Sequence, residues 1–159
     1  MENKNLVLRA ALACLLALSP YAALAQDNSV QVWLDPGFFS YHFSDADFRQ
    51  DNYGVGVGVF VAPAHGFLAG TFLNSNDERS HYVAYHWRPW GRTTEGVSVR
   101  AGFAFGAIDG YSNTNNGGWF PVILPALSAE YGHFGANLIL APHPKNGTAL
   151  ALQLRLRVW

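Results

Sequence analysis

Cysteine, charge and long hydrophobic runs are all scarce in this sequence of 159 residues. The one cysteine, Cys14, lies in an N-terminal apolar run, so the rest of the chain can form neither a disulfide framework nor a thiolate metal site. Charged residues make up only 13% of the chain, with 10 basic and 11 acidic side chains and no basic patch suited to nucleic acid. Beyond the N-terminal run, no apolar stretch is long enough to cross a bilayer as a helix.

The N-terminal region has the three parts of a secretory signal peptide. Lys4 and Arg9 precede the apolar run "AALACLLAL", and the small residues "ALA" at 23–25 end it. The sequence therefore predicts a signal peptide over residues 1–25. The remaining residues, 26–159, have a length typical of one domain.

Two segments alternate strictly between kinds of side chain, which is the pattern of a β-strand. In "YGVGVGVFV" at 53–61, tyrosine and valines share one face, and glycines and a phenylalanine share the other. In "ALALQLRLRVW" at 149–159, leucines share one face, and the opposite face carries Arg155 and Arg157. A continuous face of valine and leucine suits contact with lipid, and inward arginines suit a polar lumen.

Turn signals divide the chain into eight such segments. The sequence therefore predicts an all-β fold, an eight-stranded antiparallel transmembrane β-barrel. The strands are expected near 36–43, 52–62, 66–74, 79–88, 96–107, 119–130, 133–142 and 148–158. Turns are expected at one end over 62–66, 88–96 and 131–133, and more polar loops at the other over 44–51, 74–80, 108–118 and 142–147. Segment 26–35 has room for only one or two helical turns. The alternative is a soluble β-sandwich or closed barrel. It requires polar outward faces, whereas the outward faces of 53–61 and 149–159 are apolar.

Two polar positions fall at the same predicted rim of the barrel. His42 ends the first strand, while Asn74 and Ser75 end the third or begin its loop. The first and third strands run in the same direction, so these residues are expected to meet. A neutral histidine can take a proton from a hydroxyl near neutral pH. The alternative is an interfacial histidine beside a solvated turn. The spacing of the other histidines predicts no metal site.

The residues above, with three further pieces, resemble the lipid A palmitoyltransferase (PagP) family of outer-membrane enzymes. The pieces are "WRP" at 87–89, "FPVILPALSAEYG" at 120–132 and "LAPHP" at 140–144. That family is an eight-stranded barrel, preceded by an amphipathic helix, that moves a palmitoyl chain from a phospholipid to lipid A. Its functional histidine ends the first strand, as His42 does, and its functional Asp-Ser pair follows the third strand, where this chain has Asn74 and Ser75. The departures are the Asn in place of Asp and the near absence of the amphipathic helix.

The resemblance implies an outer-membrane acyltransferase of a Gram-negative cell. His42 would be the general base, Ser75 would assist it and Asn74 would orient it, with neither a cofactor nor a metal. The implied partners are a phospholipid donor, lipid A or a related glycolipid as acceptor, and the barrel-assembly machinery, with the barrel itself a monomer. The alternative is a non-catalytic small barrel with a structural or envelope-defence role. The terminal Trp159, whose parity opposes that of the leucines, is expected to face inward or fray.

Prolines and glycines each leave two interpretations open. Pro125 and Pro142 remove donors from the strand ladders, so they either open a lateral path into the barrel or simply end strands. The expected inward glycines either form a slot for an acyl chain or relieve crowding against Trp87, Trp119 or the several phenylalanines. These glycines are Gly54, Gly56, Gly58, Gly70, Gly102 and Gly106.

Overall fold

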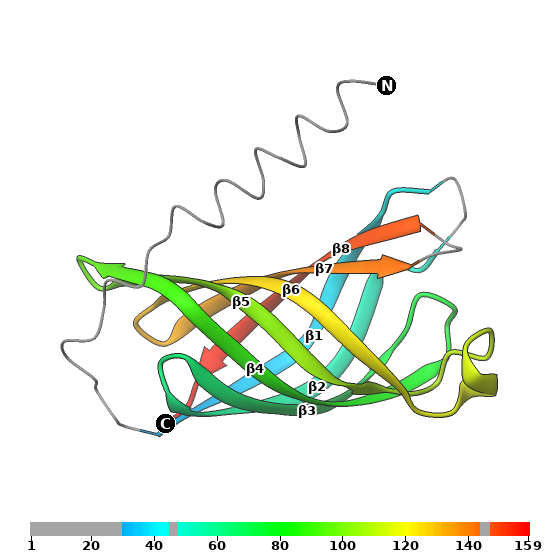
Figure 1. The fold of residues 1–159 in the computed structure, drawn as a ribbon, viewed down its shortest axis with the longest axis horizontal. Coiled ribbons are helices and arrows are strands. Elements are labelled where there is room, and N and C mark those ends of the chain that lie inside the picture. Colours follow the sequence, from blue (N-terminus) through cyan, green and yellow to red (C-terminus); the bar gives the residue numbers. More distant parts are fainter. Residues whose placement is uncertain (1–29, 45–47, 144–146) are drawn as a thin grey trace.

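The protein is a closed antiparallel β-barrel of eight strands in which each strand pairs with its neighbours in the sequence and β1 pairs with β8 (Figure 1). The computed structural model describes residues 30–44, 48–143 and 147–159. The predicted signal peptide lies outside the described residues. The strands are β1 (Gln31–His42), β2 (Asp51–Ala62), β3 (His65–Leu73), β4 (Arg79–Thr94), β5 (Val97–Ile108), β6 (Phe120–Tyr131), β7 (Phe134–His143) and β8 (Gly147–Arg157).

The fold confirms the eight predicted strands, and three local predictions were wrong. The predicted turn at 88–96 is mostly strand, because β4 continues to Thr94 and the chain reverses at Glu95 and Gly96, which both have positive φ. The first strand, expected to begin near residue 36, begins at Gln31. Trp159 neither faces inward nor frays: the residue is 79% exposed, and its backbone exchanges hydrogen bonds with that of Val32.

The alternation of side chains sorts the barrel into a buried inside and an apolar outside. On β2, Tyr53, Val55 and Val57 are exposed, and on β8 Leu152, Leu154 and Leu156 are exposed. Arg155 lies between those leucines in sequence and is buried. The described residues include no helix long and apolar enough to cross a membrane.

The β2–β3, β4–β5 and β6–β7 turns lie at one end of the barrel, here the turn end, and β1, β3, β5 and β7 end at the opposite end, here the loop end (Figure 1). Near the turn end the interior is polar. Glu130 accepts hydrogen bonds from Arg88 and, at 2.6 Å, from Arg155. Both guanidinium groups are also close to aromatic rings, with Arg88 3.9 Å from the centroid of Phe60 and Arg155 4.5 Å from that of Trp33. This network fills the interior near the turn end. The half of the interior nearer the loop end is left free for a cavity.

Two of the inward glycines make room for one tyrosine. Gly70 and Gly56 stand beside Tyr82 in one row across β4, β3 and β2, and a Cβ on either glycine would collide with the Tyr82 side chain. The ring therefore lies flat across two strands at the bottom of the cavity. At these two positions the glycines relieve crowding, but against Tyr82 and not against the tryptophans or phenylalanines that the sequence suggested. Gly102 also lacks free space, because a Cβ there would meet the Trp87 carbonyl.

The seam between β6 and β7 is paired over only part of its length. Pairing runs from Tyr131 and Phe134 at the turn end to Ala126 and Ile139, and then stops. Beyond that point β6 continues through Pro125 to Phe120, and the two strands diverge toward the loop end (Figure 1). A proline cannot donate to a neighbouring strand, which is consistent with the loss of pairing at this position.

Candidate functional site

His42 and Ser75 are in direct contact at the loop end of the barrel. The Nε2 atom of His42 lies 2.9 Å from the hydroxyl oxygen of Ser75, although 33 residues separate them in the chain. With Ser75 donating, Nε2 is the acceptor and the Nδ1 atom carries the proton, which is the tautomer that a base requires. The proximity expected from strand direction is therefore confirmed.

Neighbouring contacts fix the histidine ring and the serine backbone. The imidazole packs on Phe48, with 4.7 Å between the ring centroids. The carbonyl of Ser75 accepts a hydrogen bond from the backbone N–H of Arg49, and the Arg49 guanidinium pairs with Asp77. The β1–β2 loop thus holds the β3–β4 loop from the side.

Asn74 does not orient the imidazole, contrary to the sequence-based expectation. Its side chain is completely buried, and its Oδ1 atom accepts the backbone N–H groups of Asn76 at 2.8 Å and Glu78 at 3.1 Å. Its Nδ2 atom donates to the Ser80 hydroxyl at 2.9 Å and to the Gly110 carbonyl at 2.8 Å. Within the described residues, the Asn74 side chain is therefore bonded to the β3–β4 loop, the start of β4 and the β5–β6 loop, and not to His42.

The Nδ1 atom of His42 is buried and has no hydrogen-bond partner within the described ranges. In a catalytic triad a carboxylate occupies that position and stabilises the imidazolium. The described residues also contain no group of three or more His, Cys, Asp or Glu side chains that could hold a metal ion. The His42–Ser75 pair is therefore a base and a hydroxyl without a third charged member.

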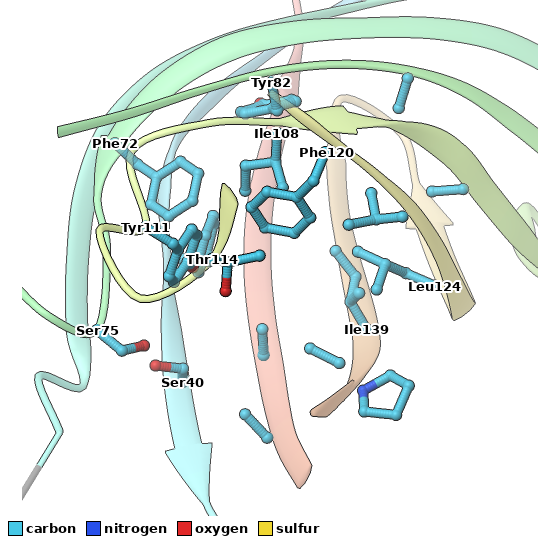
Figure 2. Close-up of a pocket in the computed structure, with 18 of the residues that line it drawn as sticks. Ser40, Phe72, Ser75, Tyr82, Ile108, Tyr111, Thr114, Phe120, Leu124 and Ile139 are labelled. Carbon is cyan, nitrogen blue, oxygen red and sulfur yellow. The ribbon is translucent and has the colours of Figure 1, made fainter. Parts of the chain in front are cut away.

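A cavity of about 240 Å³ lies directly beneath this pair. Figure 2 shows its aromatic and aliphatic walls, which come from strands all around the barrel, and Tyr82 at its far side. The lining combines large side chains from β1 and from β3 to β7 with small alanines from β4, β5, β7 and β8. Its main members are Phe38, Phe72, Tyr82, Ala104, Ile108, Phe120, Leu124, Ile139, Ala141 and Ala151. Such a space accepts a hydrocarbon chain and offers few partners to a polar ligand.

The β5–β6 loop, residues 109–119, covers part of the mouth of this cavity. Tyr111, Asn113 and Thr114 line the cavity from above, and Figure 2 shows the labelled Tyr111 and Thr114 between Ser75 and the interior. Tyr111 packs edge-on against Phe120, with 5.9 Å between centroids, and its burial raises the pKa of its phenol to about 12. The phenol therefore stays neutral under ordinary conditions.

Sequence reasoning found His42 and Ser75 but missed Tyr82 and Tyr111. Tyr82 is part of an ordinary alternating strand, and only the strand register places it over Gly56 and Gly70. Tyr111 is one of two aromatic residues, with Trp119, in an otherwise polar loop, and its aromatic character was the one available signal of a packing role.

No protein-family model matches this chain, and no curated protein matches it. The fold and the His42–Ser75 contact therefore carry the functional interpretation.

Proposed function

We propose that this protein is an outer-membrane lipid acyltransferase that moves an acyl chain from a phospholipid to lipid A or a related glycolipid. The observation that carries the proposal is the His42–Ser75 hydrogen bond of 2.9 Å at the mouth of an apolar cavity inside a barrel. A base and a hydroxyl above a hydrocarbon slot are the parts needed to cleave a lipid ester whose chain lies in the barrel.

The outer surface supports membrane insertion. Exposed valine, leucine and isoleucine side chains surround the middle of the barrel, and exposed aromatic residues lie toward both ends. Tyr41, Phe43 and Tyr53 are exposed near the loop end, while Tyr131 and Phe134 are exposed near the turn end. An apolar band between two aromatic girdles is the pattern of an outer-membrane barrel.

The partly unpaired seam supports entry of a lipid chain from the side. Leu124 of β6 and Ala141 of β7 both line the cavity, and both lie beyond the last paired residues of the seam. An acyl chain in the surrounding bilayer could pass between these strands without leaving an apolar environment. This supports the first of the two interpretations of Pro125 and Pro142.

The chemistry follows from the position of the histidine. The acceptor hydroxyl attacks the carbonyl carbon of the donor ester as Nε2 of His42 takes its proton. The new carbon–oxygen bond forms, the bond to the glycerol oxygen breaks, and the imidazolium returns the proton to that oxygen. Ser75 holds the same nitrogen before the acceptor arrives and then remains within reach to assist the transfer.

Two measurements test the proposal. The protein should fractionate with outer membranes and change its gel mobility on boiling, as folded membrane barrels do. Mass spectra of lipid A from cells with and without the protein should then differ by one added acyl chain, and His42→Ala should abolish that difference. Recovery of a soluble protein, or identical lipid A spectra, would reject the proposal.

One observation favours a second candidate, a non-catalytic barrel. The unpartnered Nδ1 of His42 means that no described carboxylate stabilises an imidazolium. In a serine-protease triad, replacing the aspartate by asparagine costs about 10⁴ in turnover. A barrel of this kind without acyl transfer would bind a lipid chain in its cavity but would not catalyse a reaction.

A further inference from the structure

Asn74 joins two loops that the sequence separates widely. Residues 74–78 connect β3 to β4 and include Ser75, while residues 109–119 connect β5 to β6 and cover the cavity mouth. The Nδ2 atom of Asn74 donates to the carbonyl of Gly110 at 2.8 Å, across 36 residues of sequence. The side chain is completely buried, so water cannot replace this bond without opening the contact.

The surroundings fix which end of the Asn74 amide is the donor. Two backbone N–H groups, those of Asn76 and Glu78, point at the Oδ1 atom, and a carbonyl oxygen stands against the Nδ2 atom. A carbonyl accepts and a backbone N–H donates, so the reversed amide would lose three bonds. An ionised carboxylate at this position would keep the two bonds to Asn76 and Glu78 but place an oxygen against the Gly110 carbonyl.

Gly110 itself permits the close approach of the two loops. It has a φ of +81°, and a Cβ there would collide with the carbonyl of Arg79. Its N–H donates to the Gly117 carbonyl at 2.9 Å, which closes the base of the β5–β6 loop. The loop is therefore internally closed and is anchored to the barrel rim near Gly110.

We propose that Asn74 is a positioning residue that holds the β5–β6 loop as a lid over the cavity mouth, and that this role requires an amide. The lid places Tyr111 and Thr114 over the space in which an acyl chain would lie. Release of the Asn74–Gly110 bond frees that mouth and lets a chain exchange with the surroundings. The inference deepens the proposed function and rests on it for the identity of the chain.

Asn74→Asp tests the proposal with a minimal change, because it removes the donor and keeps both acceptor bonds within the β3–β4 loop. Asn116→Asp is the matched control: it introduces the same charge on the exposed surface of the lid itself. Both proteins are refolded as full barrels, and boiling-dependent gel mobility establishes that each is folded.

Chymotrypsin and a fluorescent lipid provide the two readouts. In Asn74→Asp, cleavage after the half-buried Tyr111 and exchange of a pyrene-labelled fatty acid should each accelerate about tenfold, since loss of one buried hydrogen bond corresponds to a factor of that order. The urea midpoint of the barrel should stay within the range of the Asn116→Asp control. Rates equal to those of the control would overturn the proposal, as would a fall in the urea midpoint that accounts for the faster cleavage.

Neither readout requires acyl transfer, so the inference and the proposed function can fail separately. Faster exchange in Asn74→Asp, together with no transferase activity in the parent protein, would support the lid and reject the proposed acyltransferase function. In an active parent, Asn74→Asp should raise the KM for the phospholipid more than it lowers kcat, because His42 and Ser75 keep their contact. An equal loss in kcat with unchanged KM would assign Asn74 to the chemistry and overturn the positioning role.

Discussion

Glu130 on β6 accepts a hydrogen bond of 2.6 Å from Arg155 on β8, across the interior and past the intervening strand β7. The same carboxylate accepts a bond from Arg88 on β4, and both guanidinium groups are almost inaccessible to solvent. One acidic side chain therefore compensates two buried cations at the turn end of the barrel.

Replacing Glu130 by Gln should destabilise the barrel strongly. The change removes the carboxylate that accepts hydrogen bonds from both buried guanidinium groups, and breaking a buried pair in this way costs about 3–5 kcal/mol. Urea unfolding in detergent micelles measures the loss. Asp77→Asn is the control, because the Asp77 carboxylate that pairs with Arg49 is 70% exposed and such pairs contribute about 0–1 kcal/mol. Equal shifts for the two variants would contradict the importance of the internal network.

Gly56→Ala should be costly only while the Tyr82 hydroxyl is present. The added Cβ would collide with that hydroxyl, whereas the ring carbon that bears it lies 3.3 Å away. We expect a loss of about 1–3 kcal/mol in the parent protein, the usual effect of overpacking, and a clearly smaller loss in a Tyr82→Phe background. A double-mutant cycle of urea unfolding gives the coupling. Simple additivity would show that Gly56 serves another purpose.

The link between Glu78 and the lid should weaken in acid. The Ser112 N–H donates to the Glu78 carboxylate at 2.9 Å, and this hydrogen bond lowers the pKa of Glu78. A lowered pKa means that the link is fully present above the ordinary glutamate pKa of about 4.3 and is lost as the pH falls through the lowered value. Exchange of a pyrene-labelled fatty acid should accelerate over that range.

The control for this pH dependence is Glu78→Gln, whose amide oxygen still accepts the Ser112 N–H but does not titrate. The hydrogen bond that Asp109 accepts from the backbone N–H of His81, at 2.5 Å, is unchanged in this control. An identical acid response in Glu78→Gln would show that the Glu78–Ser112 link does not cause the effect.

The sequence predicted the barrel well because its signal is local. Alternation within β2 and β8 reports directly which side of a strand faces outward, and this holds whatever the partner strand is. The bounds of β4 were wrong because Arg88 and Pro89 look like a turn. In the structure they lie at a register shift between Trp87 and Trp90. Arg88 is held inside the barrel by its pairing with Glu130, and β4 continues past this point.

The candidate site was predictable only where strand direction alone decided it. His42 and Ser75 end two strands that run in parallel directions, so their meeting follows from topology. The hydrogen-bond partner of Asn74 depends on how the β5–β6 loop folds back over the barrel rim. Nothing in the residues around Asn74 or Gly110 predicts that the two residues come into contact. The sequence shows an amide at position 74, where the resembled family has a carboxylate. Only the structure shows that this amide forms hydrogen bonds with the β3–β4 and β5–β6 loops.

The β6–β7 seam should be open at the loop end and closed at the turn end. Oxidation of Ala126→Cys with Ile139→Cys, which are paired, should give a high yield of disulfide. Leu124→Cys with Ala141→Cys, two residues beyond the last pair on each diverging strand, should give much less. Non-reducing gels measure both yields after removal of residues 1–25, which hold the one natural cysteine. Equal yields would indicate a continuous seam and would remove the proposed lateral path.

The most direct test of the central claim is acyl transfer by the purified barrel in vesicles that contain one defined phospholipid and lipid A. Mass spectrometry should detect lysophospholipid and an equal amount of lipid A with one added acyl chain. His42→Ala should reduce the rate by about 10² to 10⁴, the range for loss of a general base. His133→Ala, at the exposed β6–β7 turn, should leave the rate unchanged. Absence of transfer in the folded parent protein, or equal rates in the parent and His42→Ala, would contradict the claim.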